Sequence, residues 1–294
     1  MLKKSLVVCI TAVLVVMGAT TTAAQTDRTR DGLTGMVKMV TEESGTWVEG
    51  SIIFVQTTVY DRAGNTAEFE ISQYKVGSSR FPERLRSIYE RNAHGKIAVK
   101  KSFDEAGVLQ SQVVYIYDEK ANRTEERHLD KDGRLLLKFI KTYDTSGHEV
   151  ETKSYSGDGS LKSKWQSVYD QKGNLVLHSS FTDCVADQNC RTLEYKAVNT
   201  YDSQGNLTES LILKSDGKID EKRVNRYDSA NHLIEKATFN ADGSLREKEV
   251  YSYKFDESGN WIERVTSKLN ANSRLEQAST NRRTITYYAG SEKS

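Results

Sequence analysis

Two cysteines and a nearby histidine form the first group of residues in this sequence that could do chemistry. Cys184 and Cys190 flank a short polar loop, and His178 precedes them. These residue types bind zinc, but their spacing does not match the common zinc motifs. A close cysteine pair in an exported protein most often forms a disulfide, so we predict a Cys184–Cys190 bridge and no metal. The loop at 182–191 also protrudes enough to contact a partner.

Aspartates close to glycines offer a second kind of chemistry, calcium binding. Asp130-Lys131-Asp132-Gly133 resembles a fragment of a calcium loop, but it lacks the further ligands and the distal Glu that such loops contain. Turn formation explains the sequence better, because Asp and Gly are the residues that tight turns prefer. We therefore expect neither a metal nor a cofactor.

The histidines are too scattered to define an active site. The five are spread along the chain, and no Ser-His-Asp or Cys-His group can be assembled from their positions. We assign no catalytic residue. A hydrolase with its site on the concave face of the sheet is kept as the second alternative function.

A short turn motif recurs along most of the chain and organises it. Its clearest copy runs from Tyr201 to Leu207 and reads Tyr-Asp-Ser-Gln-Gly-Asn-Leu. The Asp carboxylate accepts bonds from backbone N–H groups further on, and Gly tolerates the positive φ that follows a type I turn. The predicted turn residues are Asp118, Asp144, Gly147, Asp170, Gly173, Asp202, Gly205, Asp228, Asp256 and Gly259.

The spacing of the turns reveals an internal repeat. Tyr-Asp turns alternate with a second turn type, such as Phe239-Asn-Ala-Asp-Gly243, in a unit of 26 residues that holds two strands. Alternating turns predict an up-and-down antiparallel meander. We expect an all-β protein of about 16 strands forming a long, twisted and coiled sheet, for which partial closure into a barrel is conceivable.

Two charged columns appear when the repeats are aligned. In the bulged register that we favour, which sets Val176 against Val198, Thr208 against Val224 and Ile234 against Val250, the columns fall on opposite faces. Such rows usually solvate a sheet and discourage edge pairing, and the alternative is a stripe that binds a partner. The lysine column, the predicted partner-binding surface, consists of Lys138, Lys164, Lys196, Lys222 and Lys248, and the glutamate column includes Glu209 and Glu235.

An aromatic column marks the Tyr-Asp turns. If its rings are exposed they could stack on sugar rings, which makes a carbohydrate-binding module the first alternative function; if buried, they pack against the facing leucines. The facing apolar residues favour burial. The column is Tyr117, Tyr143, Tyr169, Tyr201, Tyr227 and Phe255.

The beginning of the chain has the layout of a secretory signal peptide. Lysines precede an apolar run that ends in small residues, so we expect residues 1–24 to be removed and the protein to be exported to the periplasm, cell surface or medium, with no transmembrane segment left. The formal net charge of +1 gives no reason to expect nucleic acid as a partner. Charged columns on both faces argue against a lipid-facing barrel.

The remaining chain is expected to be one domain, 25–294. Residues 33–90 read as an N-terminal cap with irregular repeats, 91–260 as regular repeats with the insertion 182–191, and 261–288 as C-terminal cap strands. Caps are expected because the ends of a repeat array must be shielded.

The Tyr-Asp-x-x-Gly-Asn-Leu copies resemble the YD repeats of the Rhs and teneurin type, or a related bacterial hairpin repeat, over roughly residues 33–288. The resemblance implies a coiled β-sheet shell in a surface or secreted interaction protein, and it carries over no catalytic residue. We therefore predict an exported, non-catalytic interaction or structural module of the cell envelope or extracellular space. Its partner would be a protein or a cell-surface glycan.

Overall fold

The computed structural model describes residues 26–49, 51–76, 83–184, 190–270 and 273–289. The expected signal peptide and the tip of the cysteine loop lie outside these residues. The described elements are one short helix and 18 strands. They are α1 Asp27–Arg30, β1 Val37–Gly45, β2 Ile52–Tyr60, β3 Thr66–Lys75, β4 Glu83–Arg91, β5 Ile97–Phe103, β6 Leu109–Asp118, β7 Arg123–Asp130, β8 Leu135–Tyr143, β9 Glu149–Ser156, β10 Leu161–Tyr169, β11 Leu175–Cys184, β12 Cys190–Tyr201, β13 Leu207–Lys214, β14 Ile219–Tyr227, β15 Leu233–Asn240, β16 Leu245–Phe255, β17 Trp261–Leu269 and β18 Leu275–Tyr287.

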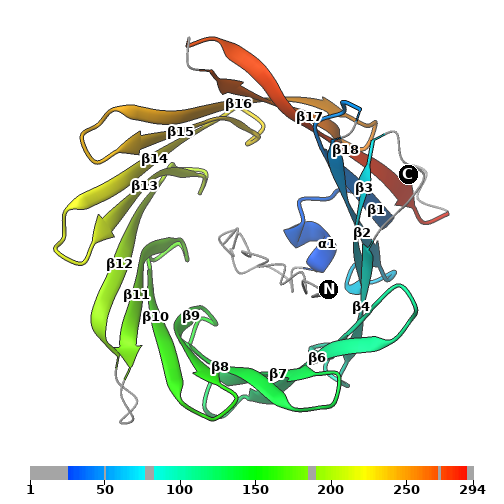
Figure 1. Cartoon of the computed structure of the whole chain (residues 1–294), viewed down its shortest axis with the longest axis vertical. Coiled ribbons are helices and arrows are strands. Elements are labelled where there is room, and N and C mark those ends of the chain that lie inside the picture. The colour runs from blue at the N-terminus through cyan, green and yellow to red at the C-terminus, as the bar shows by residue number, and fades with distance from the viewer. Residues whose placement is uncertain (1–25, 50, 77–82, 185–189, 271–272, 290–294) are drawn as a thin grey trace, which may run out of the picture.

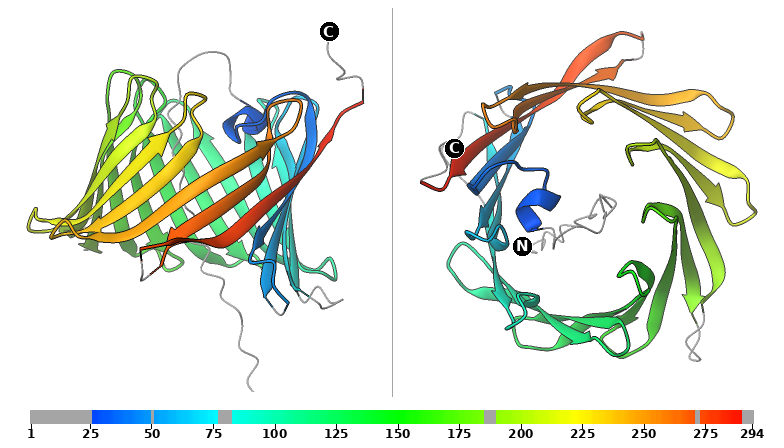
Figure 2. Two further views of the ribbon diagram at one scale, coloured as in Figure 1. Left: turned by 90° about the horizontal axis from the view of Figure 1, so that it is seen from above. Right: turned by 180° about the vertical axis from the view of Figure 1, so that it is seen from behind.

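The strands form one antiparallel sheet that closes on itself as a barrel (Figures 1 and 2). Each strand pairs with its neighbours in sequence, and β1 also pairs with β18, from Val37 opposite Tyr287 to Gly45 opposite Thr280. The all-β antiparallel meander is therefore confirmed, but the long, twisted and coiled sheet with at most partial closure is wrong, because the ring closes fully, and so is the count of about 16 strands. The terminal strands do not cap two free edges, because each supplies the hydrogen-bonding partner that the other lacks.

The Tyr-Asp turns are built as hairpin turns. In the copy at Asp202, the Asp Oδ1 accepts from the backbone N–H groups of Gln204 and Asn206 at 2.9 Å each, and Gly205 N–H bonds to the Asp202 carbonyl at 3.2 Å. Gly205 has φ of 87°, a value that a residue with a Cβ adopts only with strain. Asp and a residue with positive φ thus set the position of these hairpins; that residue is Gly in most copies and Asn231 in the copy at Asp228.

The predicted strand register holds beside the second type of turn and fails further along the strands. Leu213 lies opposite Ile219 and Phe239 opposite Leu245, as expected. One residue beyond each pair a bulge moves the register by one, so that Glu209 rather than Thr208 faces Val224. A slip of one residue reverses which face a side chain occupies.

This slip brings the lysine and glutamate columns to the same face, so the expectation of opposite faces is wrong. Lys222 Nζ lies 2.6 Å from Glu209 Oε2, and Lys248 Nζ lies 2.8 Å from Glu235 Oε2. The two columns therefore form ion pairs across neighbouring strands.

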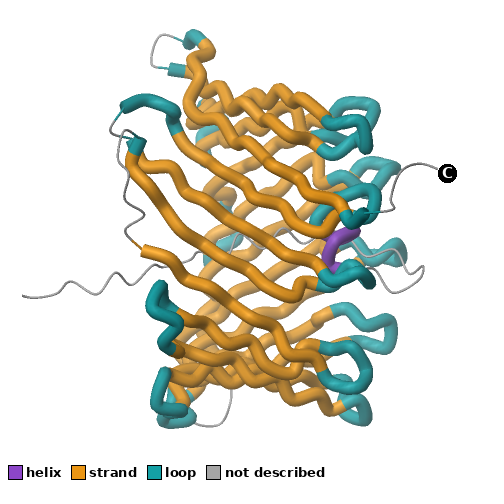
Figure 3. The backbone as a smooth tube through the Cα atoms, turned by 90° about the vertical axis from the view of Figure 1, so that its right-hand side faces the viewer, coloured by secondary structure: helices purple, strands orange, loops and turns teal. Residues whose placement is uncertain are grey.

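Helix α1 identifies which face of the sheet points into the barrel. The helix lies inside the ring of strands (Figures 1 and 2), at one end beside a row of loops (Figure 3). Leu33, which follows it, packs with Val40 and Tyr60 in a buried cluster. The face that carries Val40 and Tyr60 is thus the inner wall. Followed through the strand pairs, the inner wall includes Arg223 and Arg283, whereas the lysine column lies on the outer wall.

Tyrosines on the inner wall link successive Tyr-Asp turns. Tyr201 donates from its hydroxyl to the Leu175 carbonyl at 2.8 Å, and Tyr227 donates to the Leu207 carbonyl at 3.1 Å. Each acceptor is the first residue after the preceding Tyr-Asp turn, where a bulge interrupts the ladder. The tyrosines of the aromatic column are therefore half-buried and most of them join neighbouring hairpins at one end of the barrel, whereas Phe255 is 40% exposed and has no hydroxyl to donate.

Candidate functional site

The segment from Thr26 to Met36 is held against the inner wall at the end of the barrel where α1 lies. Asp27 fixes its beginning: its Oδ2 accepts from the Thr66 backbone N–H at 2.7 Å and from Arg91 Nη2 at 2.6 Å. Gly64 leaves the room that the segment needs, because a Cβ there would lie 2.9 Å from Thr26 Oγ1. We call residues 26–36 the N-terminal strap.

Asn260 holds the other end of the strap. Its Oδ1 accepts from the Thr34 backbone N–H at 2.7 Å and its Nδ2 donates to the Thr34 carbonyl at 2.9 Å, so one amide side chain satisfies both main-chain groups. In other turns the equivalent Asn bonds to its own Asp, as Asn206 does to Asp202 at 3.0 Å. Asn260 is 2% exposed, and it has exchanged an internal bond for one to the strap.

The strap and the inner wall enclose a cavity of about 330 Å³. The strap contributes Asp31 and Leu33, and strands β1 to β4 and β18 contribute the rest. The wall residues are Val40, Glu42, Gln56, Thr58, Tyr60, Thr66, Phe69, Tyr89 and Arg283. We call this the strap pocket. Its volume falls at the lower end of the range that ligand pockets span.

Two of the three charged groups of the strap pocket, Glu42 and Arg283, neutralise each other. Glu42 Oε2 accepts from Arg283 Nε at 2.9 Å and its Oε1 accepts from Asn281 Nδ2 at 2.8 Å. The Arg283 guanidinium also lies over the Trp261 ring, 3.5 Å from its centroid. Burial lowers the pKa of Arg283, and the charge of Glu42 opposes that shift. The pair is thus a fixed, internally compensated part of the wall.

Tyr60 and Tyr89 differ in how their hydroxyl groups are satisfied. The Tyr60 hydroxyl donates to Asp31 Oδ2, and burial together with this carboxylate raises the pKa of Tyr60, so it stays a neutral donor. Burial also raises the pKa of Tyr89. Within the described residues no group is hydrogen-bonded to the Tyr89 hydroxyl or to the Gln56 side-chain amide. The Tyr89 hydroxyl and the Gln56 amide, both uncharged, are therefore free to bind a molecule in the strap pocket.

The predicted lysine row does not contribute to this pocket. Lys138 and Lys164 lie over the rings of Tyr155 and Phe181, each 4.7 Å from the centroid, and Lys222 and Lys248 are ion-paired as described above. Lys196 lies in the same outer-wall row, opposite Ser179. The structure therefore places the row outside the barrel, with most of its members engaged by neighbours.

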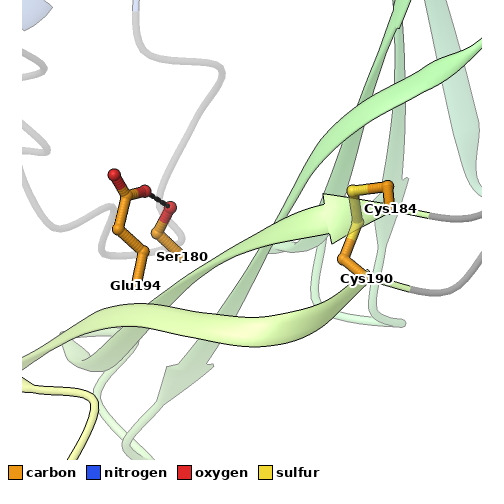
Figure 4. The surroundings of a disulfide bond; sticks show 4 residues. All are labelled: Ser180, Cys184, Cys190 and Glu194. Atoms are coloured by element: carbon orange, nitrogen blue, oxygen red, sulfur yellow. Dashed lines mark hydrogen bonds between the residues drawn. A yellow bond between two sulfur atoms is a disulfide. The ribbon is translucent and has the colours of Figure 1, made fainter.

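The cysteine pair forms a disulfide that joins the ends of β11 and β12 (Figure 4). Ser180, near it in sequence, donates to Glu194 Oε2 at 2.9 Å. His178 lies 3.2 Å from Ser167 Oγ through its Nδ1. Across the described part of the chain, no three His, Cys, Asp or Glu side chains are grouped in a way that could hold a metal.

The strap pocket could hardly be predicted from the sequence. Its residues lie in the strap, in the irregular first repeats, whose sequence predicts only a cap, and in β18. Gln56, Tyr89 and Arg283 occupy no repeated column, so no periodic signal marks them. The available hint was the departure of the first three hairpins from the 26-residue spacing.

Among the described residues, no helix has the length and apolar character needed to cross a membrane.

Comparisons with known proteins support the fold. No protein-family model matches the sequence, and no curated protein matches it. A porin-like protein from Bacteroides uniformis has a TM-score of 0.50 at 11% identity, covering 86% of this chain and 98% of that one. A porin-like protein from Bacteroides vulgatus gives 0.30 at 11% identity, covering 87% and 99%. The complex TcdB2-TccC3-Cdc42 gives 0.24 at 13%, with 76% of this chain matched to 14% of that chain. The likeness to the Bacteroides uniformis protein is one of β-sheet architecture.

Proposed function

We propose that this protein is an exported, non-catalytic binding module of the cell envelope or extracellular space, and that the inside of its barrel is the recognition surface. The observation that carries the proposal is the strap pocket, whose Gln56 amide and Tyr89 hydroxyl have no hydrogen-bond partner among the described residues. Barrels with this many strands are wide enough to leave an aqueous interior through which a ligand can reach an inner site. The Cys184–Cys190 disulfide supports export, since such bonds persist in oxidising compartments.

The outer lysine row is the weaker of two candidate surfaces. A partner that used it would have to displace the carboxylates of Glu209 and Glu235 from Lys222 and Lys248. It would gain little in return, because exposed ion pairs contribute less than about 1 kcal/mol each. The row is better suited to keeping the outer wall hydrated.

A thermal-shift screen tests the proposal. The mature protein, residues 25–294, would be screened against peptides, oligosaccharides and small metabolites, beside a Gln56→Trp variant that fills the strap pocket and a triple Lys196→Glu, Lys222→Glu, Lys248→Glu variant. We expect a ligand that raises the Tm of the parent and of the triple variant but not of Gln56→Trp. A ligand lost only in the triple variant would move recognition to the outer wall. No stabilising ligand at all would favour a purely structural role.

A further inference from the structure

The chemistry of the strap pocket indicates which class of ligand it takes; this step rests on the proposed function. We infer that the pocket binds an uncharged sugar ring of a glycan. The charged groups in its wall, Asp31, Glu42 and Arg283, sum to −1, which disfavours an anionic ligand. Arg283 is compensated by Glu42, and Asp31 accepts from Tyr60. An anionic ligand would meet two carboxylates, and the groups still open to a ligand, Gln56 and Tyr89, are uncharged.

The groups that remain are suited to hydroxyls. The Gln56 amide offers two donor hydrogens and an acceptor oxygen, and the Tyr89 hydroxyl offers one donor and one acceptor site. A sugar carries several hydroxyls that each donate and accept, so it can satisfy both groups together. A purely apolar ligand would leave both unpaired in a partly desolvated site, which is unfavourable.

The pocket also has an apolar side, as a sugar ring does. Phe69 on β3 and Leu33 on the strap both line it, with the buried Val40 beside them. One face of a pyranose consists of C–H groups, and aromatic and aliphatic side chains cover such a face favourably. Small-molecule sites generally combine an apolar wall with a few polar groups that orient the ligand.

The strap forms one wall of this site. Asp31 and Leu33 belong to the strap, which Asn260 and Asp27 hold in place. A protein in which the strap is detached would lose one wall of the pocket while its strands remain paired. The sugar site therefore depends on the exported chain folding its first residues back into the barrel.

The test uses an array of immobilised oligosaccharides, neutral (oligomers of glucose, mannose, xylose and N-acetylglucosamine) and acidic (oligogalacturonate and heparin fragments), followed by calorimetry. The proteins are the parent, Tyr89→Phe, Gln56→Leu and the control Tyr195→Phe, which alters an inner-wall tyrosine on β12 that does not line the pocket. The first two substitutions keep side-chain size and remove only hydrogen-bonding atoms. Circular dichroism and Tm confirm that each variant is folded.

We expect the parent to bind at least one neutral oligosaccharide, and Tyr89→Phe and Gln56→Leu each to weaken binding about three- to tenfold, with Tyr195→Phe unchanged. The inference is overturned if no neutral glycan binds, if only acidic glycans bind, or if neutral binding is the same in all four proteins. If Gln56→Trp abolishes binding of some non-sugar ligand in the thermal-shift screen, the proposed function stands and only the sugar assignment fails.

Discussion

Tyr253 donates a hydrogen bond from its hydroxyl to the carbonyl oxygen of Leu233 at 2.8 Å, although the nearest turn begins only at Asp256. The same bond joins Tyr227 to Leu207 and Tyr117 to Ile97, each 20 residues apart, as Tyr253 and Leu233 are. The two extra residues of the last regular repeat therefore extend β16 beyond the tyrosine. Tyr253, rather than the Phe255 of the predicted column, makes the hydrogen bond that recurs among the repeats.

Removing one of these hydroxyls is expected to weaken the barrel without changing its shape. Tyr227→Phe deletes the donor, and the Leu207 carbonyl keeps the bond from the Asn225 side chain, 2.9 Å away. We expect a loss of about 1 kcal/mol in the free energy of unfolding, measured by urea denaturation. Tyr115→Phe is the control, since no hydrogen bond of its hydroxyl is found among the described residues. Equal losses in both variants would mean that the inter-turn bond is not the cause.

The turn glycines should be intolerant of a side chain for backbone rather than packing reasons. Nothing lies closer than 3.8 Å to a Cβ placed on Gly205, yet φ there is 87°. Gly205→Ala is expected to cost about 1 kcal/mol from the left-handed conformation alone. Gly205→Asn, which tolerates that conformation better, should recover part of the loss. A neutral Gly205→Ala in the urea titration would contradict this explanation.

Acid should destabilise the barrel through its turns. The Asn206 side chain and backbone N–H groups lower the pKa of Asp202, and similar bonds lower the pKa values of Asp144, Asp170 and Asp228. Because the folded pKa lies below the value of about 3.9 for an unfolded Asp, each carboxylate stabilises the fold above that pH. The contribution is lost as the pH falls through the folded pKa.

The Tm should therefore change little between about pH 5 and 7 and decrease steeply below about pH 4. Asp202→Asn should make that decrease shallower, because one linked proton is removed. A variant with the slope of the parent would show that Asp202 is not among the groups responsible.

Detaching the strap should leave the strands paired. Asn260→Ala removes both bonds to the Thr34 main chain and a third from the Thr34 hydroxyl, and we expect faster amide hydrogen exchange and proteolysis within residues 27–36. The near-ultraviolet signal of the barrel should be largely unchanged. The matched control is Asn206→Ala, which removes the equivalent side chain from a turn that does not contact the strap. Uniformly faster exchange over all strands would indicate global destabilisation instead.

The disulfide should contribute through the loop that it closes. Replacing Cys184 and Cys190 together by serine opens a loop of sequence separation 6, for which the chain-entropy model gives about 2 kcal/mol. The comparison is the urea midpoint of the double variant against that of the parent. A parent protein treated with reductant should match the double variant.

The sequence predicted the parts of this fold that are local. Asp202 and Gly205 determine a turn through atoms within four residues, and the repeat of such turns implies the meander. Closure was not predictable in this way, because it depends on β1 meeting β18. The sequence of neither strand contains a signal that identifies the other as its partner, beyond the alternation of polar and apolar residues common to β-strands. The one-residue bulges beyond Leu213 and Phe239 were missed for a related reason: polar and apolar residues alternate on both sides of them, so either register buries comparable surface.

The candidate site was even less accessible from sequence. Its polar groups come from Gln56, Tyr89 and Arg283, which are brought together only by the closed sheet, and its wall depends on Asn260 bonding to Thr34, 226 residues away. The lysine row is predicted as a binding surface because it is periodic. Its periodicity reflects the hydration of a repeated wall, whereas the pocket uses residues that occur once.

The seam between β1 and β18 has a consequence for how the protein is made. Glu42 and Arg283 bond across it although they are 241 residues apart, so its pairing carries a large loop-closure cost and must come late in folding. Until then the growing sheet presents two unpaired edges, each a template for joining another copy. Closing the ring thus competes with aggregation while the chain folds, and dilution or a chaperone that shields the edges would increase the yield of closed barrels.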